Sequence, residues 1–431
     1  MGLIGRLRLR NLAAMTVLML VGAAAAQTVK KPSAPAVDRG AGPAPTIRIA
    51  VAPLGYVPPS AAYLSLKLSF NSLNFIDSDH LLFTFHRNML LRRIPGDPVG
   101  DNDQMIRAVV LDTKSGEVLR QADWRMHDRG RYLWALRGGT FLVRVRNSLF
   151  LTDGTLQLRP YLTFDTALQG VEVSPERGLL MLEVKKVLAS EKNEVEGDGA
   201  SRLPPSLVAP GGVRQERTQM VLVRPGERDA LAKAEFLTPA YVPLLENGVL
   251  DMDQGKKPNE WVIKKELLGK TEAEVGVVKS SCAPQLVTLS DDVVLSQNCP
   301  ERGGSGTDVS ALSLQGGVLW GELWDAKYIW GQFESSEDGS RFAYESLEMN
   351  RPIGSLDTFG EADVTAQPVG VFDTETGKLV MVTDASPILG AGQNFALSAD
   401  GRRFAILRQG AIEVYDLPPV VLAAPEVGKK K

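Results

Sequence analysis

Short apolar runs, interrupted by turn-forming residues, make up most of the chain. In several runs apolar and polar positions alternate, as at residues 63–70, where Leu64, Leu66, Leu68 and Phe70 share one face. Alternation with a period of two is typical of a half-buried β-strand, and long stretches with the 3.6-residue period of a helix are missing from the sequence. The pattern predicts an all-β fold.

The apolar runs fall into groups of four that are separated by Gly, Asp, Asn and Pro turn signals. We expect six groups of four strands and a last group of three, at residues 73–124, 133–162, 169–236, 240–279, 285–323, 331–382 and 394–416. This arrangement predicts a seven-bladed β-propeller of four-stranded antiparallel blades.

The last group lacks a fourth strand, and a radial array needs its first and last blades joined. We therefore expect an N-terminal strand, the alternating run at residues 63–70, to complete the last blade and close the ring. The alternative is that this run is an extra edge strand on the first blade.

One sequence pattern occurs twice near the C-terminus. Residues 333–343 and 395–405 share a short apolar strand, an Asp-Gly turn and a second apolar strand, with a separation of 62 residues. Residues 171–181 are a weaker copy. Repetition at such a period indicates a stacked or radial array of similar units.

The repeat also carries a family resemblance. The run Ser-Ala-Asp-Gly-Arg-Arg-Phe-Ala-Ile-Leu at residues 398–407, followed by residues 412–417, resembles blades of exported bacterial TolB-like and WD40-like propeller proteins. Residues 369–380 resemble the second half of a YVTN-type repeat. The likeness is good over residues 330–417 and faint over residues 73–236, and the recurring Gly-His and Trp-Asp pairs of true WD40 repeats are missing. It implies a fold and a tendency to bind, and no particular activity.

The N-terminus is typical of an export signal. Three arginines precede an apolar stretch at residues 12–22, and Ala24, Ala25 and Ala26 provide the small-residue cleavage pattern before Gln27. We expect residues 1–26 to be a signal peptide, 27–46 a disordered Pro/Ala-rich linker, 47–421 the propeller and 422–431 a disordered basic tail. The alternative for the first segment is an uncleaved anchor, although it is short for a membrane span, and no later segment is apolar enough to span. The protein is therefore expected in the periplasm or outside the cell.

Charge argues against nucleic acid as the main partner. The whole chain has a formal net charge of −3, and the chain without residues 1–26, which hold three arginines and no acid, has −6. The distribution is uneven: residues 85–150 contain twelve Lys or Arg and seven Asp or Glu, and residues 251–350 contain nine and seventeen. Solvated faces of opposite sign are the simplest interpretation.

Two cysteines, Cys282 and Cys299, flank a predicted hairpin. If the hairpin turns near residues 290–291, Val287 opposes Val294 and the cysteines oppose each other at its open end. An exported chain meets an oxidising compartment, so we expect a disulfide, with two free buried thiols as the alternative.

No catalytic motif, cofactor site or metal site is predicted. The sequence has no nucleophile elbow, phosphate-binding loop or His-Glu-x-x-His motif. The histidines stand on separate strands or turns without metal-ligand spacing; they are His80, His86 and His127. Asp97, Asp101 and Asp103 offer oxygen ligands for calcium, but they lack the EF-hand spacing, so a plain loop is favoured.

The longest predicted loops join the second and third strands of their blades, at residues 87–105, 188–218 and 348–367. In a propeller these loops emerge on the same face as the links between blades, and loops on a rigid scaffold commonly carry binding. The expected binding residues on this face are Arg92, Arg93, Asp101, Asp103 and Arg351. For residues 188–218 we favour a disordered insertion without function.

The function predicted from these features is non-enzymatic binding of a protein or a cell-envelope polymer through the loop-bearing face. The alternative is a propeller hydrolase or lyase that acts on a polysaccharide or another polymer. Carboxylates, or His and Arg, that converge at the mouth of the central channel would favour the enzyme. Unpaired apolar or aromatic side chains there would favour the binding protein.

Overall fold

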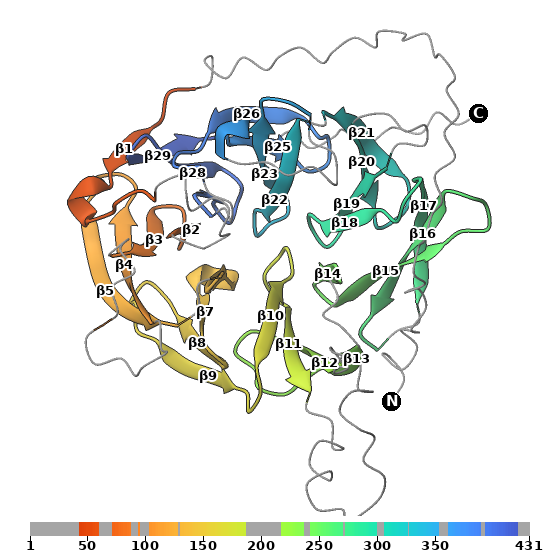
Figure 1. Ribbon diagram of the computed structural model, residues 1–431, viewed down its shortest axis with the longest axis horizontal. Coiled ribbons are helices and arrows are strands. Elements are labelled where there is room, and N and C mark those ends of the chain that lie inside the picture. Colours follow the sequence, from red (N-terminus) through yellow and green to blue (C-terminus); the bar gives the residue numbers. More distant parts are fainter. Residues whose placement is uncertain are drawn as a thin grey trace, which may run out of the picture.

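Seven antiparallel sheets stand around a common axis in the computed structural model (Figure 1). The structure describes residues 43–59, 71–87, 94, 103–127, 130–186, 217–236, 242–269, 272–299, 306–325, 327–352, 361–388 and 393–420. In these residues the regular elements other than strands are short 3-10 helices, Ala52–Leu54, Arg137–Gly139 and Glu361–Asp363. The predicted seven-bladed β-propeller is confirmed. The expected signal peptide and the C-terminal tail lie outside the described residues.

The blades follow one another in chain order, and within a blade the strands follow in order from the axis outward (Figure 1). Blade 1 consists of β2 (Asn71–Phe75), β3 (His80–His86), β4 (Gln104–Asp112) and β5 (Val118–Met126); blade 2 of β6 (Leu133–Ala135), β7 (Phe141–Val145), β8 (Ser148–Thr152) and β9 (Arg159–Thr163); blade 3 of β10 (Leu168–Val173), β11 (Leu180–Lys186), β12 (Arg217–Val223) and β13 (Ala232–Phe236). Blade 4 consists of β14 (Leu244–Leu245), β15 (Gly248–Gln254), β16 (Glu260–Leu267) and β17 (Ala273–Lys279); blade 5 of β18 (Gln285–Thr288), β19 (Val293–Asn298), β20 (Thr307–Ser313) and β21 (Val318–Trp324).

Blades 6 and 7 depart from the simple pattern. Blade 6 consists of β22 (Tyr328–Ser335), β23 (Arg341–Met349), β25 (Pro368–Asp373) and β26 (Leu379–Asp384), and a fifth strand, β24 (Val364–Ala366), pairs with β23. Blade 7 consists of β27 (Phe395–Leu397), β28 (Arg403–Arg408), β29 (Ala411–Asp416) and an outer strand, β1 (Ile47–Ala50), from the N-terminus.

The ring is closed by β1, which pairs antiparallel with β29 from Ile47 opposite Val414 to Ala50 opposite Ala411. Closure by an N-terminal strand is therefore confirmed, but the assignment of that strand to residues 63–70 is wrong, because β1 occupies the outer position of blade 7. Residues 63–70 lie outside the described residues. The closing strand needs few apolar positions, since it is an outer strand and buries chiefly Ile49.

In the described residues the hydrophobic core forms seven clusters, one at each interface between neighbouring blades. Strand β3 shows how the sequence produces this division. Leu81, Phe83 and Phe85 pack toward blade 7, and Leu82 between them packs toward blade 2. Both faces of the sheet are thus buried, which explains why such strands appear as continuous apolar runs.

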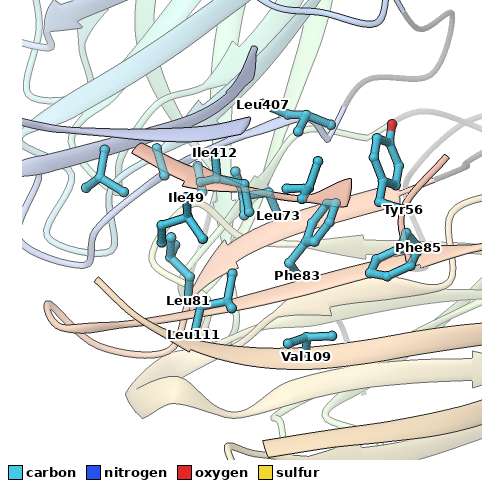
Figure 2. Packing of buried hydrophobic residues seen from close by; sticks show 14 of the residues in the cluster. Ile49, Tyr56, Leu73, Leu81, Phe83, Phe85, Val109, Leu111, Leu407 and Ile412 are labelled. Carbon is cyan, nitrogen blue, oxygen red and sulfur yellow. The ribbon is translucent and has the colours of Figure 1, made fainter. Parts of the chain in front are cut away.

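The interface between blades 7 and 1 is completed by the segment that follows β1 (Figure 2). The Tyr56 ring packs edge-on against Phe83 and Phe85, with ring centroids 5.4 and 5.5 Å apart. Edge-to-face aromatic pairs add to the stabilisation from burial alone. The N-terminal segment therefore supplies both a strand and part of a core.

The repeated sequence forms the turn between the first and second strands of blades 6 and 7. In blade 7 the Ser398 hydroxyl donates to Asp400 Oδ1 (2.7 Å) and accepts from the Arg403 amide (2.8 Å). Gly401 has a φ of 62°, which a glycine adopts without steric cost. Ser336, Asp338 and Arg341 of blade 6 repeat these contacts.

The arginine that follows the Asp-Gly turn of each repeat joins its blade to the next one. Arg341 is fully buried; it donates to Asp373 Oδ1 of its own blade (2.9 Å) and to the Gly401 carbonyl of blade 7 (2.8 Å). Arg403 makes the same kind of bridge from blade 7 to blade 1, through the Ser78 carbonyl (2.6 Å). A buried guanidinium requires such partners, because an unpaired buried charge is costly. The repeat therefore encodes contacts between blades as well as a turn.

Cys282 and Cys299 form a disulfide with their Cα atoms 5.6 Å apart. The predicted hairpin is present between them, but its register is shifted by one residue, because Val287 opposes Leu295 and not Val294. The shift arises at the turn, where the Ser290 hydroxyl accepts from the amides of Asp292 and Val293 and so fixes a longer loop. The cysteines lie beyond the ladder and can still meet.

Removal of the closing strand should open the ring. We expect a protein that lacks residues 1–51 to expose the edge of β29 and to aggregate, with a lower melting temperature than a protein that lacks only residues 1–42. Size-exclusion chromatography and thermal unfolding provide the measurement. A monodisperse shorter protein with an unchanged melting temperature would show that closure by β1 is unimportant.

Loss of the disulfide should destabilise blade 5. Cys282→Ser frees a loop whose ends are 17 positions apart, and we expect the free energy of unfolding to fall by roughly 2–4 kcal/mol. Urea denaturation of the variant and of the parent, each with and without reductant, measures the difference. Reductant should destabilise the parent and leave the variant unchanged; equal stability of both proteins would contradict this prediction.

Candidate functional site

Antiparallel pairing gives the propeller two distinct faces. The loops between second and third strands and the links between blades lie on one face, called here the loop face, and the first-to-second and third-to-fourth turns lie on the other, the turn face. Contacts support this division: the Leu168 amide, next to the link between blades 2 and 3, donates to Asn147 Oδ1 in the β7–β8 turn (3.3 Å). Of the residues predicted to bind a partner, Asp103 and Arg351 are described; Arg92, Arg93 and Asp101 lie outside the described residues.

Asp103 is the centre of an ionic cluster on the loop face of blades 1 and 2. Its carboxylate accepts from Arg125 Nε (2.6 Å), contacts His127 Nδ1 (2.7 Å) and lies 3.4 Å from Arg146 Nη2. Burial acts to raise the pKa of Asp103, but the hydrogen bonds from His127 and Arg125 outweigh it and lower the pKa to about 2. The carboxylate is only 9% exposed, whereas Arg125 and Arg146 are half exposed. Asp103 therefore anchors the cations that face the solvent.

A second aspartate extends this cluster along blade 1. Asp123 accepts from Arg107 Nε (3.0 Å) and from Arg87 Nη1 (2.7 Å). The hydrogen bond from Arg107 is the main reason that the pKa of Asp123 is lowered. Five side chains surround these two aspartates, and we call them the cationic patch: Arg87, Arg107, Arg125, His127 and Arg146.

Arg351 occupies a different part of the loop face. It lies in the second-to-third loop of blade 6, where its Nε is 3.7 Å from Asp363 Oδ1. Blade 7 separates it from blade 1. The structure thus places Asp103 and Arg351 on one face, as the loop pattern predicts, but on blades that are not neighbours.

A second cluster lies at the axis of the ring, and the sequence analysis did not identify it. Glu172 on β10 and Glu334 on β22 occupy the same position of the repeat, two residues before Ser174 and Ser336. Blades 3 and 6 are not neighbours, so groups from both blades can interact only across the axis. Together with Arg131 and Arg177 these glutamates form what we call the axial cluster.

Arg177 connects the two sides of the ring. Its Nη2 lies 3.7 Å from Glu334 Oε1 and donates to the Ser335 carbonyl at 3.4 Å. Arg177 replaces the turn glycine of the repeat, the position of Gly339 and Gly401, and keeps a φ of 64°. A non-glycine residue in this conformation costs roughly 1–3 kcal/mol and is frequent at functional sites.

Arg131 approaches the axis from the loop face, immediately before β6. Its guanidinium lies over the Trp134 ring, 5.6 Å from the ring centroid, and Nε donates to the Leu133 carbonyl (3.3 Å). With the Gln393 amide oriented toward it, the side-chain oxygen of Gln393 also accepts from Nε (2.6 Å). These partners are neutral, so the charge of Arg131 has no carboxylate within ion-pair distance among the described residues.

The axial cluster is enclosed by protein but reached by solvent. Arg131 and Glu172 are exposed side chains. Burial nevertheless lowers the pKa of Arg131 and raises the pKa of Glu172, and each group partly offsets the shift of the other. Burial also raises the pKa of Glu334, opposed by Arg177 and Arg131. Both groups are therefore exposed to solvent at a place where neighbouring protein atoms partly desolvate their charges.

The turn face beside the axial cluster is tied together by a network across blades 2 to 5. Arg137 Nη2 lies 3.2 Å from both Glu176 Oε2 and Glu246 Oε1. Glu176 Oε1 accepts from the Asp291 amide (3.2 Å), and the Glu246 amide donates to Asp291 Oδ1 (2.8 Å). A Cβ on Gly178 would lie 1.6 Å from Glu246, so only glycine permits this approach. The network fixes the blades that present Glu172 and Arg177.

A buried polar chain links the axis to blade 6. Glu345 accepts from the Gln367 amide, and Asn394, next to Gln393, donates to Gln367 Oε1 (2.9 Å). Among the described residues the second oxygen of Glu345 has no hydrogen-bond partner. Burial raises the pKa of Glu345 to about 7, despite the hydrogen bond from Gln367.

The described residues show neither a metal-binding cluster nor a membrane-spanning helix. They contain no group of three or more His, Cys, Asp or Glu side chains arranged to hold a metal ion. Within the same residues, no helix has the length and apolar character needed to cross a membrane.

Comparisons with known proteins concern the fold. No family model and no curated protein matches this sequence. Among solved structures, an acylaminoacyl peptidase in complex with Z-Gly-Gly-Phe-chloromethyl ketone is 9% identical with a TM-score of 0.46, and the match covers 82% of this chain and 52% of that chain. The β-propeller domain of the Trilobed protease from Pyrococcus furiosus is 10% identical, with 82% and 97% covered and a TM-score of 0.43. The C-terminal WD40 domain of Sif2 is 10% identical, with 87% and 98% covered and a TM-score of 0.36.

The chain thus spans about half the length of the acylaminoacyl peptidases that it resembles. The structural neighbours include WD40 and other β-propeller proteins.

Glu345 should make stability depend on pH. Because its pKa in the folded protein is raised above the unfolded value, the folded state favours the protonated form, and stability is lost as the pH rises from about 4.5 to about 7. Glu345→Gln, which stays neutral, should therefore be more stable than the parent at pH 8 by on the order of 3 kcal/mol and similar to it at pH 4.5. Urea denaturation at both pH values is the measurement, and a difference that does not change with pH would contradict the assignment.

Proposed function

We propose that the protein is an exported, non-enzymatic propeller that binds a protein or a cell-envelope polymer through its loop face. The contact region that we assign is the cationic patch of blades 1 and 2, together with Arg351 on blade 6 and with Arg92, Arg93 and Asp101, which lie outside the described residues. The observation that carries the proposal is the arrangement around Asp103, where half-exposed arginines are held by a nearly buried carboxylate.

This arrangement favours recognition of anionic groups. The planar fork of a guanidinium matches the geometry of carboxylate or phosphate oxygens. Because Arg125 and Arg146 are fixed by Asp103, they lose little conformational entropy on binding. Electrostatic complementarity of this kind mainly supplies specificity and a fast association rate.

Export is supported by two features. The N-terminal 26 residues have the composition of a signal peptide. The Cys282–Cys299 disulfide is compatible with an oxidising compartment.

Neutralising the cationic patch should weaken binding without unfolding the protein. We expect Arg125→Gln combined with Arg146→Gln, and separately Arg92→Glu with Arg93→Glu, to reduce affinity on the order of tenfold or more and to make it less sensitive to salt. Binding of the immobilised protein to isolated peptidoglycan, lipopolysaccharide, teichoic acid and envelope-protein extracts is the measurement.

The matched control lies on the turn face, where Lys114 and Lys378 are exposed in tight turns. Lys114→Gln combined with Lys378→Gln changes the net charge as much as Arg125→Gln with Arg146→Gln does, and it should leave binding intact. An equal loss from these control substitutions, or full binding by the patch variants, would remove the case for a loop-face site.

The axial cluster favours a second candidate function, a hydrolase or lyase that acts on a polymer. Two carboxyl groups with raised pKa face arginines across the axis, and a raised carboxyl pKa suits general acid catalysis near neutral pH. If this function is correct, Glu172→Gln and Glu334→Gln should abolish release of fragments from polysaccharide substrates while binding is retained. Absence of turnover by the parent protein on such substrates argues for the binding function.

A further inference from the structure

Two oxygen atoms in the buried polar chain between blades 6 and 7 have no hydrogen-bond donor. This chain consists of Glu345 on β23, Gln367 just before β25 and Asn394 just before β27, and all three residues are at most 2% exposed. Among the described residues, Glu345 Oε2 and Asn394 Oδ1 accept no hydrogen bond. Buried polar atoms are rarely left unpaired in folded proteins, so these two need an explanation.

The direction of the hydrogen bonds determines which atoms are left over. Asn394 Nδ2 donates to Gln367 Oε1 (2.9 Å) and to the Pro387 carbonyl (3.3 Å), so each of its two N–H bonds has an acceptor. The Gln367 side-chain nitrogen in turn donates to Glu345 Oε1. These bonds fix the orientation of both amides. The oxygens that remain, on Asn394 and on Glu345, can only accept.

Contacts place the two oxygens in one hydrogen-bonded unit. The Gln367 amide group bonds to Glu345 through its nitrogen and to Asn394 through its oxygen, so the two residues lie at the two ends of a single amide. The backbone fixes this arrangement. The Leu407 amide donates to the Asn394 carbonyl (2.7 Å), and the Ala385 amide donates to the Gln367 carbonyl (2.8 Å).

The charge of Glu345 is not balanced by any side chain in the described part of the protein. Its hydrogen-bond partner Gln367 is neutral, and no cationic side chain contributes to the pKa of Glu345. An ionised carboxylate in a buried place is costly unless a positive charge accompanies it. A ligand for this unit therefore needs to supply positive charge and to satisfy acceptors.

We propose that this unit binds a monovalent cation, such as potassium, sodium or ammonium, with Glu345 Oε2 and Asn394 Oδ1 as protein ligands. One positive charge balances one carboxylate. Carboxylate and carbonyl oxygens are the usual ligands of hard cations, and carbonyl oxygens can replace the water around potassium. A divalent ion fits less well, because it would leave a net charge in a buried place and the described residues hold no group of three His, Cys, Asp or Glu ligands.

A cation at this place would join blade 6 to blade 7. Glu345 and Gln367 belong to blade 6, whereas Asn394 leads into the first strand of blade 7. A ligand that binds the folded protein and not the unfolded chain increases stability as its concentration rises above its dissociation constant. Stabilisation that depends on the identity of the cation is therefore the expected signature.

The test compares salts at equal ionic strength. The purified chain is unfolded by heat at pH 8 in choline chloride and in the chlorides of potassium, sodium and ammonium. We expect at least one of the small cations to raise the melting temperature by about 2 °C or more relative to choline, which is too large for the unit. After equilibrium dialysis, elemental analysis or an ammonium assay should find a single equivalent of that cation retained by each chain.

Glu345→Gln separates a bound ion from a general effect of salt. The variant keeps an acceptor for Gln367 but loses the charge, so the difference between salts and the retained cation should both disappear. Glu375→Gln is the control, because this residue is exposed on the turn face and its substitution changes the net charge equally. The control should behave like the parent in every salt.

Two outcomes would overturn the proposal. Equal melting temperatures in all four salts, with no retained cation, would show that water or a proton satisfies the unit. A cation-dependent shift that persists in Glu345→Gln would place the ion elsewhere. The experiment is independent of the proposed partner binding, because Arg125→Gln with Arg146→Gln changes blades 1 and 2 and should keep the difference between salts.

Discussion

The mutual burial of neighbouring blades is the constraint on which the rest of this structure depends. No blade has a core of its own; each of the seven apolar clusters is shared by two sheets. A sheet at the end of an open row would leave one apolar face in water, at a cost proportional to the exposed area. The chain must therefore close on itself. Strand β1 achieves this by pairing with β29, and Ile49 and Tyr56 pack into the core between blades 7 and 1.

Polar contacts fix the position of each blade relative to the next one in the ring. Burial is non-directional, so it does not by itself fix how one sheet is placed on the next. Arg341 and Arg403 do so, because each binds an aspartate in its own blade and a carbonyl in the following one. The conspicuous part of the repeat, its Asp-Gly turn, shapes the end of one blade, and the less conspicuous arginine joins two.

Much of the fold could be predicted from the sequence, because strands and turns depend on neighbouring residues. The groups of four strands and the Asp-Gly turns follow from local patterns. The closing strand was misassigned because the run at residues 63–70 alternates more clearly than Ile47–Ala50, although an outer strand needs little apolar surface. The hairpin register between the cysteines was off by one residue, since the hydrogen bonds of a single hydroxyl, that of Ser290, decide the loop length.

The axial cluster was missed for a different reason. The aligned repeats place glutamate at the same position in residues 171–181 and 333–343, and this signal was present in the sequence. Its meaning depends on geometry, because positions in blades 3 and 6 meet only when the ring is closed. The loop pattern predicts which face carries the long loops. It does not predict that Arg125, His127 and Arg146 gather around Asp103, because these residues come from separate segments of blades 1 and 2.

Closure by the N-terminal strand also has a consequence in time. Thr46 and Asp416, which meet through a hydrogen bond at the end of this ladder, are 370 positions apart, so synthesis of the chain delivers β1 long before its partner strand. Contacts between such distant positions form slowly, because the entropy cost of closing a very long loop comes before the contacts contribute any stability. Until then the edge of β29 and the apolar faces of blades 7 and 1 have no partner, and unpaired edges are where chains associate wrongly. Closure by β1 is therefore also the step that removes the exposed strand edge through which one molecule could associate with another.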